Sequence, residues 1–207
     1  MKSTMSFYGV LVRQVRGFLV VCAALCLVLV SVAGCSVTFL GDTSQTSGPA
    51  PFPSISGTAL NADQRALLTV LEAEYAKQPP GTTYSQGVDE PWCADFVSWV
   101  YNSVGLPFDN PNSGSWRIPG VFTLEDYFRS AHMFHSPDAG FTPQLGDVVL
   151  YDSTTSKVWG GHTNIVLSVD SGQLTTIGGN QPGGITITTY ALTDPELGIR
   201  GYGRRIP

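Results

Sequence analysis

The segment that decides the fold is "PWCADFVSWVYNSVG", residues 91–105. Its apolar side chains recur three and four residues apart, which is the spacing of an amphipathic helix. Proline is tolerated at the start of a helix and glycine commonly follows its end, so Pro91 and Gly105 predict the two limits of this helix. Cys93 therefore falls in the first helical turn, where backbone N–H groups have no partner inside the helix.

The first 34 residues have the pattern of an export signal. Basic residues without acidic ones precede the apolar run "GFLVVCAALCLVLVSV" (17–32), and small residues follow it. The ending "VAGC" (32–35) resembles the lipobox of bacterial lipoproteins. This resemblance implies that Cys35 receives a lipid such as palmitate, which holds the protein at the extracytoplasmic face of the cell membrane. The alternative is an uncleaved anchor, because the run is near the roughly 17 residues needed to span a bilayer.

The cysteines leave one thiol unexplained. Cys22 and Cys26 are removed when the signal is cleaved, and Cys35 carries the lipid. Cys93 is therefore the one cysteine expected in the folded part. Exported proteins usually pair their thiols. A leftover thiol indicates an intermolecular bridge, a buried inert side chain or a reactive nucleophile.

Charge and composition narrow the classes of partner. Cleavage before Cys35 removes three of the 11 basic residues and leaves 8 against 16 acidic ones, a formal charge of −8. The chain has no basic run, which excludes nucleic acid as an expected partner. Residues 35–60 comprise the lipidated cysteine and a flexible tether rich in Ser, Thr, Pro and Gly. Residues 61–207 then suit a single domain.

Within this domain the pattern predicts helices first and strands afterwards. Asn61 and Gln64 form a capping-box pattern before an apolar stripe, and Pro79 stops that helix. A third helix is expected from Thr123 to about Ala131. Segments rich in β-branched residues follow at 146–152, 162–170, 173–179 and 185–191. This order predicts the α+β class, with N-terminal helices packed on an antiparallel sheet.

The turn "DSG" (170–172) joins two of these strands as a hairpin and determines which side chains face each other. A three-residue turn puts His162 opposite Asn180, whereas a two-residue turn puts it opposite Gln181. We expect the first arrangement, which brings an imidazole and an amide to the same face of the sheet.

Cys93 and this hairpin together suggest a thiol nucleophile. A helix N-terminus and a nearby imidazole both favour the thiolate, and His162 is the candidate base. The side-chain oxygen of Asn180 is expected to hold the imidazole in place. Backbone N–H groups of the first helical turn are candidate donors to an oxyanion.

Three blocks carry a family resemblance: "PWCADFVSWVYNSVGLP", "PQLGDVVLYD" and "WGGHTNIVLSVDSGQLTTIGGN". They resemble the CHAP family, the cysteine- and histidine-dependent amidohydrolases/peptidases of bacterial cell walls, over roughly residues 61–206. The resemblance implies a papain-like fold related to NlpC/P60 enzymes and cleavage of peptide or amide bonds in peptidoglycan. It also implies that Cys93 is the nucleophile, His162 the base and Asn180 the polar third residue. Nothing in it requires a cofactor or a metal.

Two positions depart from the family pattern. Many members have Glu where this chain has Gly178, and many have Gln where it has Trp92, with Gln86 a distant candidate for the second role. The alternatives are therefore an inactive CHAP-like lipoprotein that binds the cell wall, or an enzyme that transfers the acyl group. Specificity is expected to reside in the loops 105–122 and 136–145.

Other polar and aromatic residues have simpler explanations. His132 and His135 are three residues apart but have no further metal ligands near them in the sequence. Asp95 is expected in solvent or in the helix cap rather than as a catalytic acid. Trp159 directly precedes the segment "GGH", and we expect it in the core or at the rim of a substrate groove.

Overall fold

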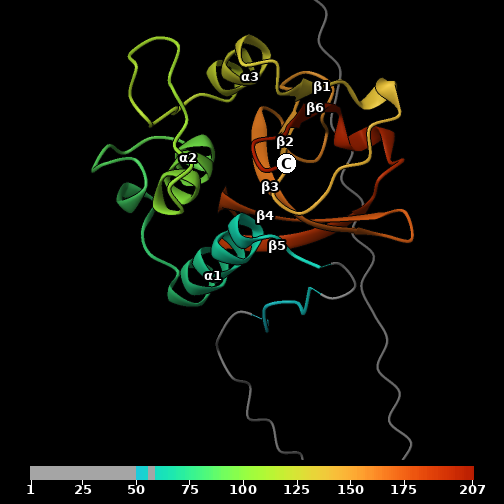
Figure 1. Cartoon of the computed structure of the whole chain (residues 1–207), viewed down its shortest axis with the longest axis horizontal. Coiled ribbons are helices and arrows are strands. Elements are labelled where there is room, and N and C mark those ends of the chain that lie inside the picture. Colours follow the sequence, from blue (N-terminus) through green and yellow to red (C-terminus); the bar gives the residue numbers. More distant parts are fainter. Residues whose placement is uncertain (1–49, 56–58) are drawn as a thin grey trace, which may run out of the picture. The chain divides into compact units, whose positions relative to one another are not determined.

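The computed structural model describes residues 50–55 and 59–207 (Figure 1). The predicted signal (1–34), the lipid site at Cys35 and most of the tether lie outside these residues. Within the described part, no helix has the length and apolar character needed to cross a bilayer.

Three α-helices precede the sheet: α1 (Ala62–Lys77), α2 (Cys93–Ser103) and α3 (Val121–Ser130). The capping box of α1 is present, because Gln64 N donates to Asn61 Oδ1 at 2.8 Å and Asn61 N donates to Gln64 Oε1 at 3.1 Å. The end of α2 is also confirmed, since Gly105 follows it with a φ of 77°. The predicted start of α3 at Thr123 is wrong: Gly120 is the N-cap, and the helix begins directly after it.

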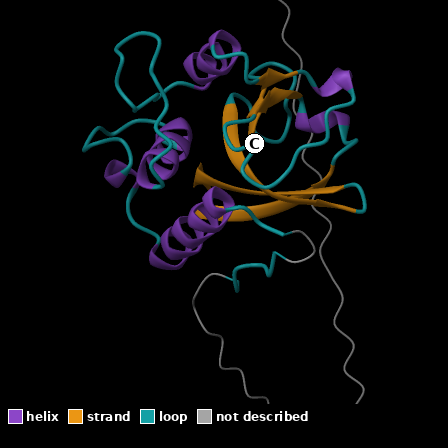
Figure 2. Ribbon diagram, in the orientation of Figure 1, coloured by secondary structure: helices purple, strands orange, loops and turns teal. Residues whose placement is uncertain are grey.

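The sheet has six strands in the order β1-β6-β2-β3-β4-β5, and every neighbouring pair is antiparallel (Figure 2). The strands are β1 (Phe134–His135), β2 (Val148–Tyr151), β3 (His162–Asp170), β4 (Gln173–Gln181), β5 (Gly184–Ala191) and β6 (Ile199–Gly203). Short 3₁₀ helices occupy Gly81–Thr83, Pro137–Ala139 and Pro195–Leu197. The predicted α+β class, with helices packed on an antiparallel sheet, is confirmed.

The two faces of the sheet have different cores. Helix α2 packs on β3 and β4, and α1 packs beside α2 (Figure 1). The side chains on this face include Leu67, Leu71, Phe96, Val97, Val100, Val148, Leu150, Ile165, Leu167 and Ile177. The opposite face buries a smaller cluster of Val149, Tyr151, Val166, Leu174, Leu197 and Tyr202. Strand residues therefore alternate between the two cores.

The hairpin between β3 and β4 differs from the expected one. Asp170 pairs with Gln173, so the turn has two residues, Ser171 and Gly172, and the predicted three-residue turn is wrong. Both turn residues have positive φ, 50° and 77°, as a tight hairpin with the twist of its strands requires. The pairing then shifts between Val166 and Ser168 because β3 contains an extra residue there, a β-bulge.

Candidate active site

Cys93 is the first residue of α2 and is held there by packing around Trp92. The indole of Trp92 stacks on Tyr84, with ring centroids 5.3 Å apart. Two glycines flank the indole: a Cβ atom at Gly81 or at Gly179 would overlap the ring. The Trp92 side chain is thus fixed in position between Tyr84 and the two glycines. Because Trp92 is the N-cap of α2, its fixed position also determines where the helix begins, with Cys93 as the first helical residue.

The thiol of Cys93 is buried, with 4% of the residue exposed, and it lies against the start of β3. Burial raises the pKa of the Cys93 thiol, and the nearby charge of Asp95 raises it further. Hydrogen bonds with the backbone of Ala94, Thr163 and Cys93 itself act in the opposite direction and lower this pKa, without overcoming burial. The resting side chain is therefore a neutral thiol, and the hydrogen bond with Thr163 ties it to the residue that follows His162.

His162 begins β3 and is a buried, neutral imidazole. Burial lowers its pKa from 6.5 to about 4, against the smaller, opposing effect of the nearby Asn164 side chain. One flank of the ring stacks on Trp159, with ring centroids 5.0 Å apart and 22° between the planes. Trp159 therefore lies beside the candidate base, in agreement with its expected place in the core or at the groove rim. A neutral imidazole can accept a proton, which is the first requirement for a general base.

The lowered pKa of His162 predicts a loss of stability in acid. The unfolded chain protonates this imidazole below pH 6.5, whereas the folded chain does so only near pH 4. The stability that depends on the neutral ring is thus present above pH 6.5 and is lost as the pH falls toward 4, by roughly 3 kcal/mol in total. Urea unfolding of the wild type and of His162→Gln across this range should show that difference. The Gln side chain does not titrate, so equal pH dependence of the two proteins would contradict the assignment.

The side chain that contacts His162 is Gln181, not Asn180. Gln181 is buried, and its Nε2 lies 3.2 Å from Nε2 of His162 and donates to Asn164 Oδ1 at 2.8 Å. Asn180 is exposed, has a φ of 59°, and makes no side-chain hydrogen bond among the described residues. The expected His162–Asn180 pair is thus corrected. Strand β4 contains an extra residue between Gly178 and Gln181, which turns Asn180 outward and Gln181 inward.

Gly178 leaves room for a polar side chain from the neighbouring strand. A Cβ at Gly178 would overlap Asn164 Oδ1 and lie 2.7 Å from Nε2 of Gln181. Asn164, fully buried, fills the space that a side chain at position 178 would need. Sequence reasoning missed Asn164. The available signal was its position two residues after His162, which puts both side chains on the same face of β3.

A buried ion pair connects α2 to the loop that follows it. Asp95 is fully buried, and its Oδ1 lies 2.7 Å from Nε of Arg117, which also pairs with Glu90. The expectation that Asp95 lies in solvent or in the helix cap is therefore wrong. Burial raises the pKa of Asp95 to about 6. The Ser98 hydroxyl donates a hydrogen bond to the backbone oxygen of Ile118 and accepts one from its backbone N–H. The end of the 105–122 loop is therefore held against α2 by two contacts, through Arg117 and through Ile118.

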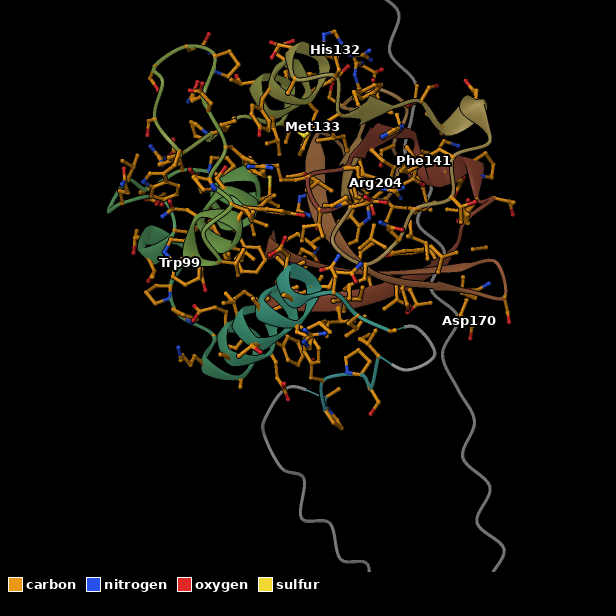
Figure 3. The ribbon with its side chains drawn as sticks, viewed as in Figure 1. Trp99, His132, Met133, Phe141, Asp170 and Arg204 are labelled. Carbon is orange, nitrogen blue, oxygen red and sulfur yellow. The ribbon has the colours of Figure 1, made fainter. Side chains whose placement is uncertain are left out.

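The other candidate residues lie apart from this cluster. His132 is exposed with a φ of 58° and lies two residues after the end of α3 (Figure 3). His135 stacks on Phe141, with ring centroids 4.2 Å apart. Gln86 is exposed, with a φ of 58°. Within residues 50–55 and 59–207, no three His, Cys, Asp or Glu side chains are grouped so as to hold a metal ion.

These features define an α+β domain in which a thiol at a helix start meets the strand that carries a buried neutral imidazole. Residues 83–180 match the family model of the CHAP domain, and the match includes both Cys93 and His162.

Comparison with solved structures adds more distant similarities. One is the crystal structure of Ly7917 with the hydrolyzing product of MDP, which is 20% identical with a TM-score of 0.40. That match covers 67% of this chain and 61% of the other. A second crystal structure of Ly7917 is 18% identical with the same TM-score, and the match covers 70% of this chain and 62% of the other. The similarity thus spans about three-fifths of the length of these structures. Among curated proteins, none is significantly similar to this chain.

Proposed function

We propose that this protein is a peptidoglycan hydrolase that cleaves peptide or amide bonds through the thiol of Cys93. One observation carries the proposal: the Cys93 thiol sits at the start of α2 and is hydrogen-bonded to the backbone of Thr163, directly after the neutral His162. The CHAP match over residues 83–180 supports the substrate class.

The proposed reaction begins with transfer of the thiol proton of Cys93 to His162. The sulfur then forms a bond to the carbonyl carbon, and the carbonyl electron pair moves to oxygen. N–H groups of the first turn of α2 lack partners inside the helix and are available to stabilise this oxyanion. The C–N bond breaks, and the amine leaves with the proton from the imidazolium. Water then attacks the thioester, His162 accepts a proton from it, and the carboxylic acid departs as the thiol regains its proton.

Gln181 takes the orienting role in this proposal. Its contact at Nε2 of His162 occupies one ring nitrogen and leaves Nδ1 as the nitrogen that serves Cys93. A hydrogen-bonded third group of this kind holds the ring, and it favours the tautomer that accepts the nucleophile's proton when its oxygen faces Nε2. Gln181 thereby replaces Asn180 in the proposed set of Cys93, His162 and a polar third residue.

The test is incubation of the purified full chain with peptidoglycan, followed by mass spectrometry of the released fragments. Wild type should release fragments whose masses identify the bond that is cut, and Cys93→Ala should release none. Equal fragments from both proteins would exclude the thiol mechanism. The absence of fragments from wild type, with the protein still retained on the wall, would favour the alternative of a wall-binding lipoprotein.

We also propose that residues 1–34 are a cleaved signal and that Cys35 carries the lipid, with residues 36–60 as the tether to the outer surface of the membrane. The basic start, the apolar run and the "VAGC" ending support this. Growth with labelled palmitate should label the wild type. Label retained at full strength in Cys35→Ser would contradict the anchor.

A further inference from the structure

A row of buried polar side chains continues behind His162 on the face of the sheet that points away from the helices. After Gln181 comes Asn164, whose Nδ2 donates to Thr176 Oγ1 at 3.0 Å. The Thr176 hydroxyl lies 3.2 Å from that of Thr188. Asn164 is fully buried and Thr176 is 1% exposed, so these groups have each other rather than solvent as partners. The row is therefore a hydrogen-bond chain that ends on the imidazole, with the buried Tyr151 hydroxyl beside Asn164 and Thr176.

The hydrogen bonds of this row can run in two directions, because turning an amide over exchanges its oxygen and nitrogen without changing its shape. In the first direction, the Gln181 amide N–H groups donate to both His162 Nε2 and Asn164 Oδ1, and Asn164 donates to Thr176. This direction requires a bare Nε2, so the imidazole proton is on Nδ1. In the second direction both amides are turned over. Gln181 Oε1 then accepts from His162 Nε2–H and from Asn164, and Asn164 Oδ1 accepts from Thr176.

The two amides must turn together. If Gln181 turned alone, its oxygen would face the oxygen of Asn164, and two acceptors at 2.8 Å would repel each other. Thr186 donates to the other end of the Gln181 amide, and a hydroxyl accepts or donates equally well. The Thr186 hydroxyl therefore adapts to either direction, and Asn164 is the neighbour whose orientation Gln181 has to match.

We propose that Asn164 is a positioning residue that sets the direction of the Gln181 amide and, through it, the tautomer of His162. This inference rests on the proposed function, because that mechanism needs a bare Nδ1 to accept the Cys93 proton. Only the second direction supplies it, with the proton on Nε2 facing Gln181 Oε1. The same direction gives the imidazolium an acceptor after proton transfer. Gly178 contributes the space that lets Asn164 reach this position.

The tautomer can be measured directly by ¹⁵N NMR of the imidazole nitrogens in the full chain. The chain has three histidines, so the signal of His162 is assigned by its loss in His162→Gln. Wild type should carry the proton on Nε2. Asn164→Leu keeps a similar shape without a donor or acceptor, and should move the proton toward Nδ1. It should lower the rate of wall hydrolysis roughly ten- to a hundredfold.

A second substitution should restore the tautomer. In Asn164→Leu/Gln181→Glu the carboxylate is an acceptor in either orientation, so it does not need Asn164 and should return the proton to Nε2. Thr176→Val, a smaller change that keeps the strand shape, should shift the tautomer in the same sense as Asn164→Leu. Its matched control is Thr175→Val, because Thr175 pairs with Thr189 at 2.9 Å on the exposed side of the same two strands.

The result that overturns the inference is an unchanged tautomer in both Asn164→Leu and Thr176→Val, or a wild-type proton on Nδ1. This readout does not depend on hydrolysis. A tautomer that shifts as expected in a protein that releases no wall fragments would refute the proposed function alone. Fragments from the wild type together with an unmoved tautomer would refute the role of Asn164 alone.

Discussion

Replacing His162 by Ala should lower the rate of wall hydrolysis by roughly a thousandfold, because a positioned general base contributes about 10²–10⁴ to the rate. The Cys93 thiol is buried and its pKa is raised, so at neutral pH it depends on a neighbouring base to lose its proton. Alkylation of Cys93 by iodoacetamide at pH 7 should slow in the same variant. Release of soluble wall fragments and the alkylation rate are the two measurements.

The matched control for this experiment is His132→Ala. His132 is exposed, follows α3 and belongs to none of the contacts around Cys93 (Figure 3). Its replacement should leave both rates within a factor of two. The folded fraction of His162→Ala has to be measured as well, since the ring packs on Trp159. A folded His162→Ala that still hydrolyses the wall within threefold of wild type would remove His162 from the mechanism.

Replacing Gly178 by Glu should destabilise this protein, although many members of the resembling family have Glu at that position. The Cβ of any side chain at Gly178 would overlap Asn164 Oδ1, and the fully buried neighbours leave little room to relax. Overpacking of this kind costs typically about 1–3 kcal/mol, and burying a new carboxylate adds to it. The free energy of unfolding in urea is the measurement.

Removing the obstructing side chain should reverse much of this loss. In Gly178→Glu/Asn164→Ala the carboxylate can occupy the space that Asn164 vacates, beside Gln181. The double-mutant cycle should therefore show a favourable interaction of about 1–3 kcal/mol. Gln173→Glu, which adds a carboxylate at an exposed position of the same strand, should change stability by less than about 0.5 kcal/mol. If the two substitutions were simply additive, Asn164 and a side chain at position 178 would not compete for the same space.

Two strands show the limits of reading this sequence alone. Strand β1 has only two residues, and β6 contains Gly201 and Gly203, so neither has the run of β-branched residues that marks a strand. The glycines are there because a Cβ at Gly201 would overlap the ring of Phe134, and one at Gly203 would overlap Phe128. Close contact between elements, which local patterns do not report, explains this part of the sheet.

The hairpin illustrates how a correct strand prediction can still misplace a side chain. The bounds of β3 agree with the predicted segment 162–170 to the residue. Its partner across the hairpin depended on turn length and on two bulges, one in each strand. Each extra residue reverses the faces of the residues beyond it, because side chains alternate along a strand. The choice between Asn180 and Gln181 was therefore open to an error of one residue.

The sequence by itself determined the helix of residues 93–103, the cysteine at its start, the strand that begins at His162 and the α+β order of elements. These features depend on periodicity, capping and composition over short segments, which are local properties of the chain. Only the tertiary structure decided that Gln181 contacts His162, that Asn164 fills the space beside Gly178, and that Asp95 is paired with Arg117 in the interior. Those contacts join residues up to 22 positions apart in the sequence. The β-bulges that bring the polar side chains to His162 depend on how both faces of the sheet are packed, which is not a local property.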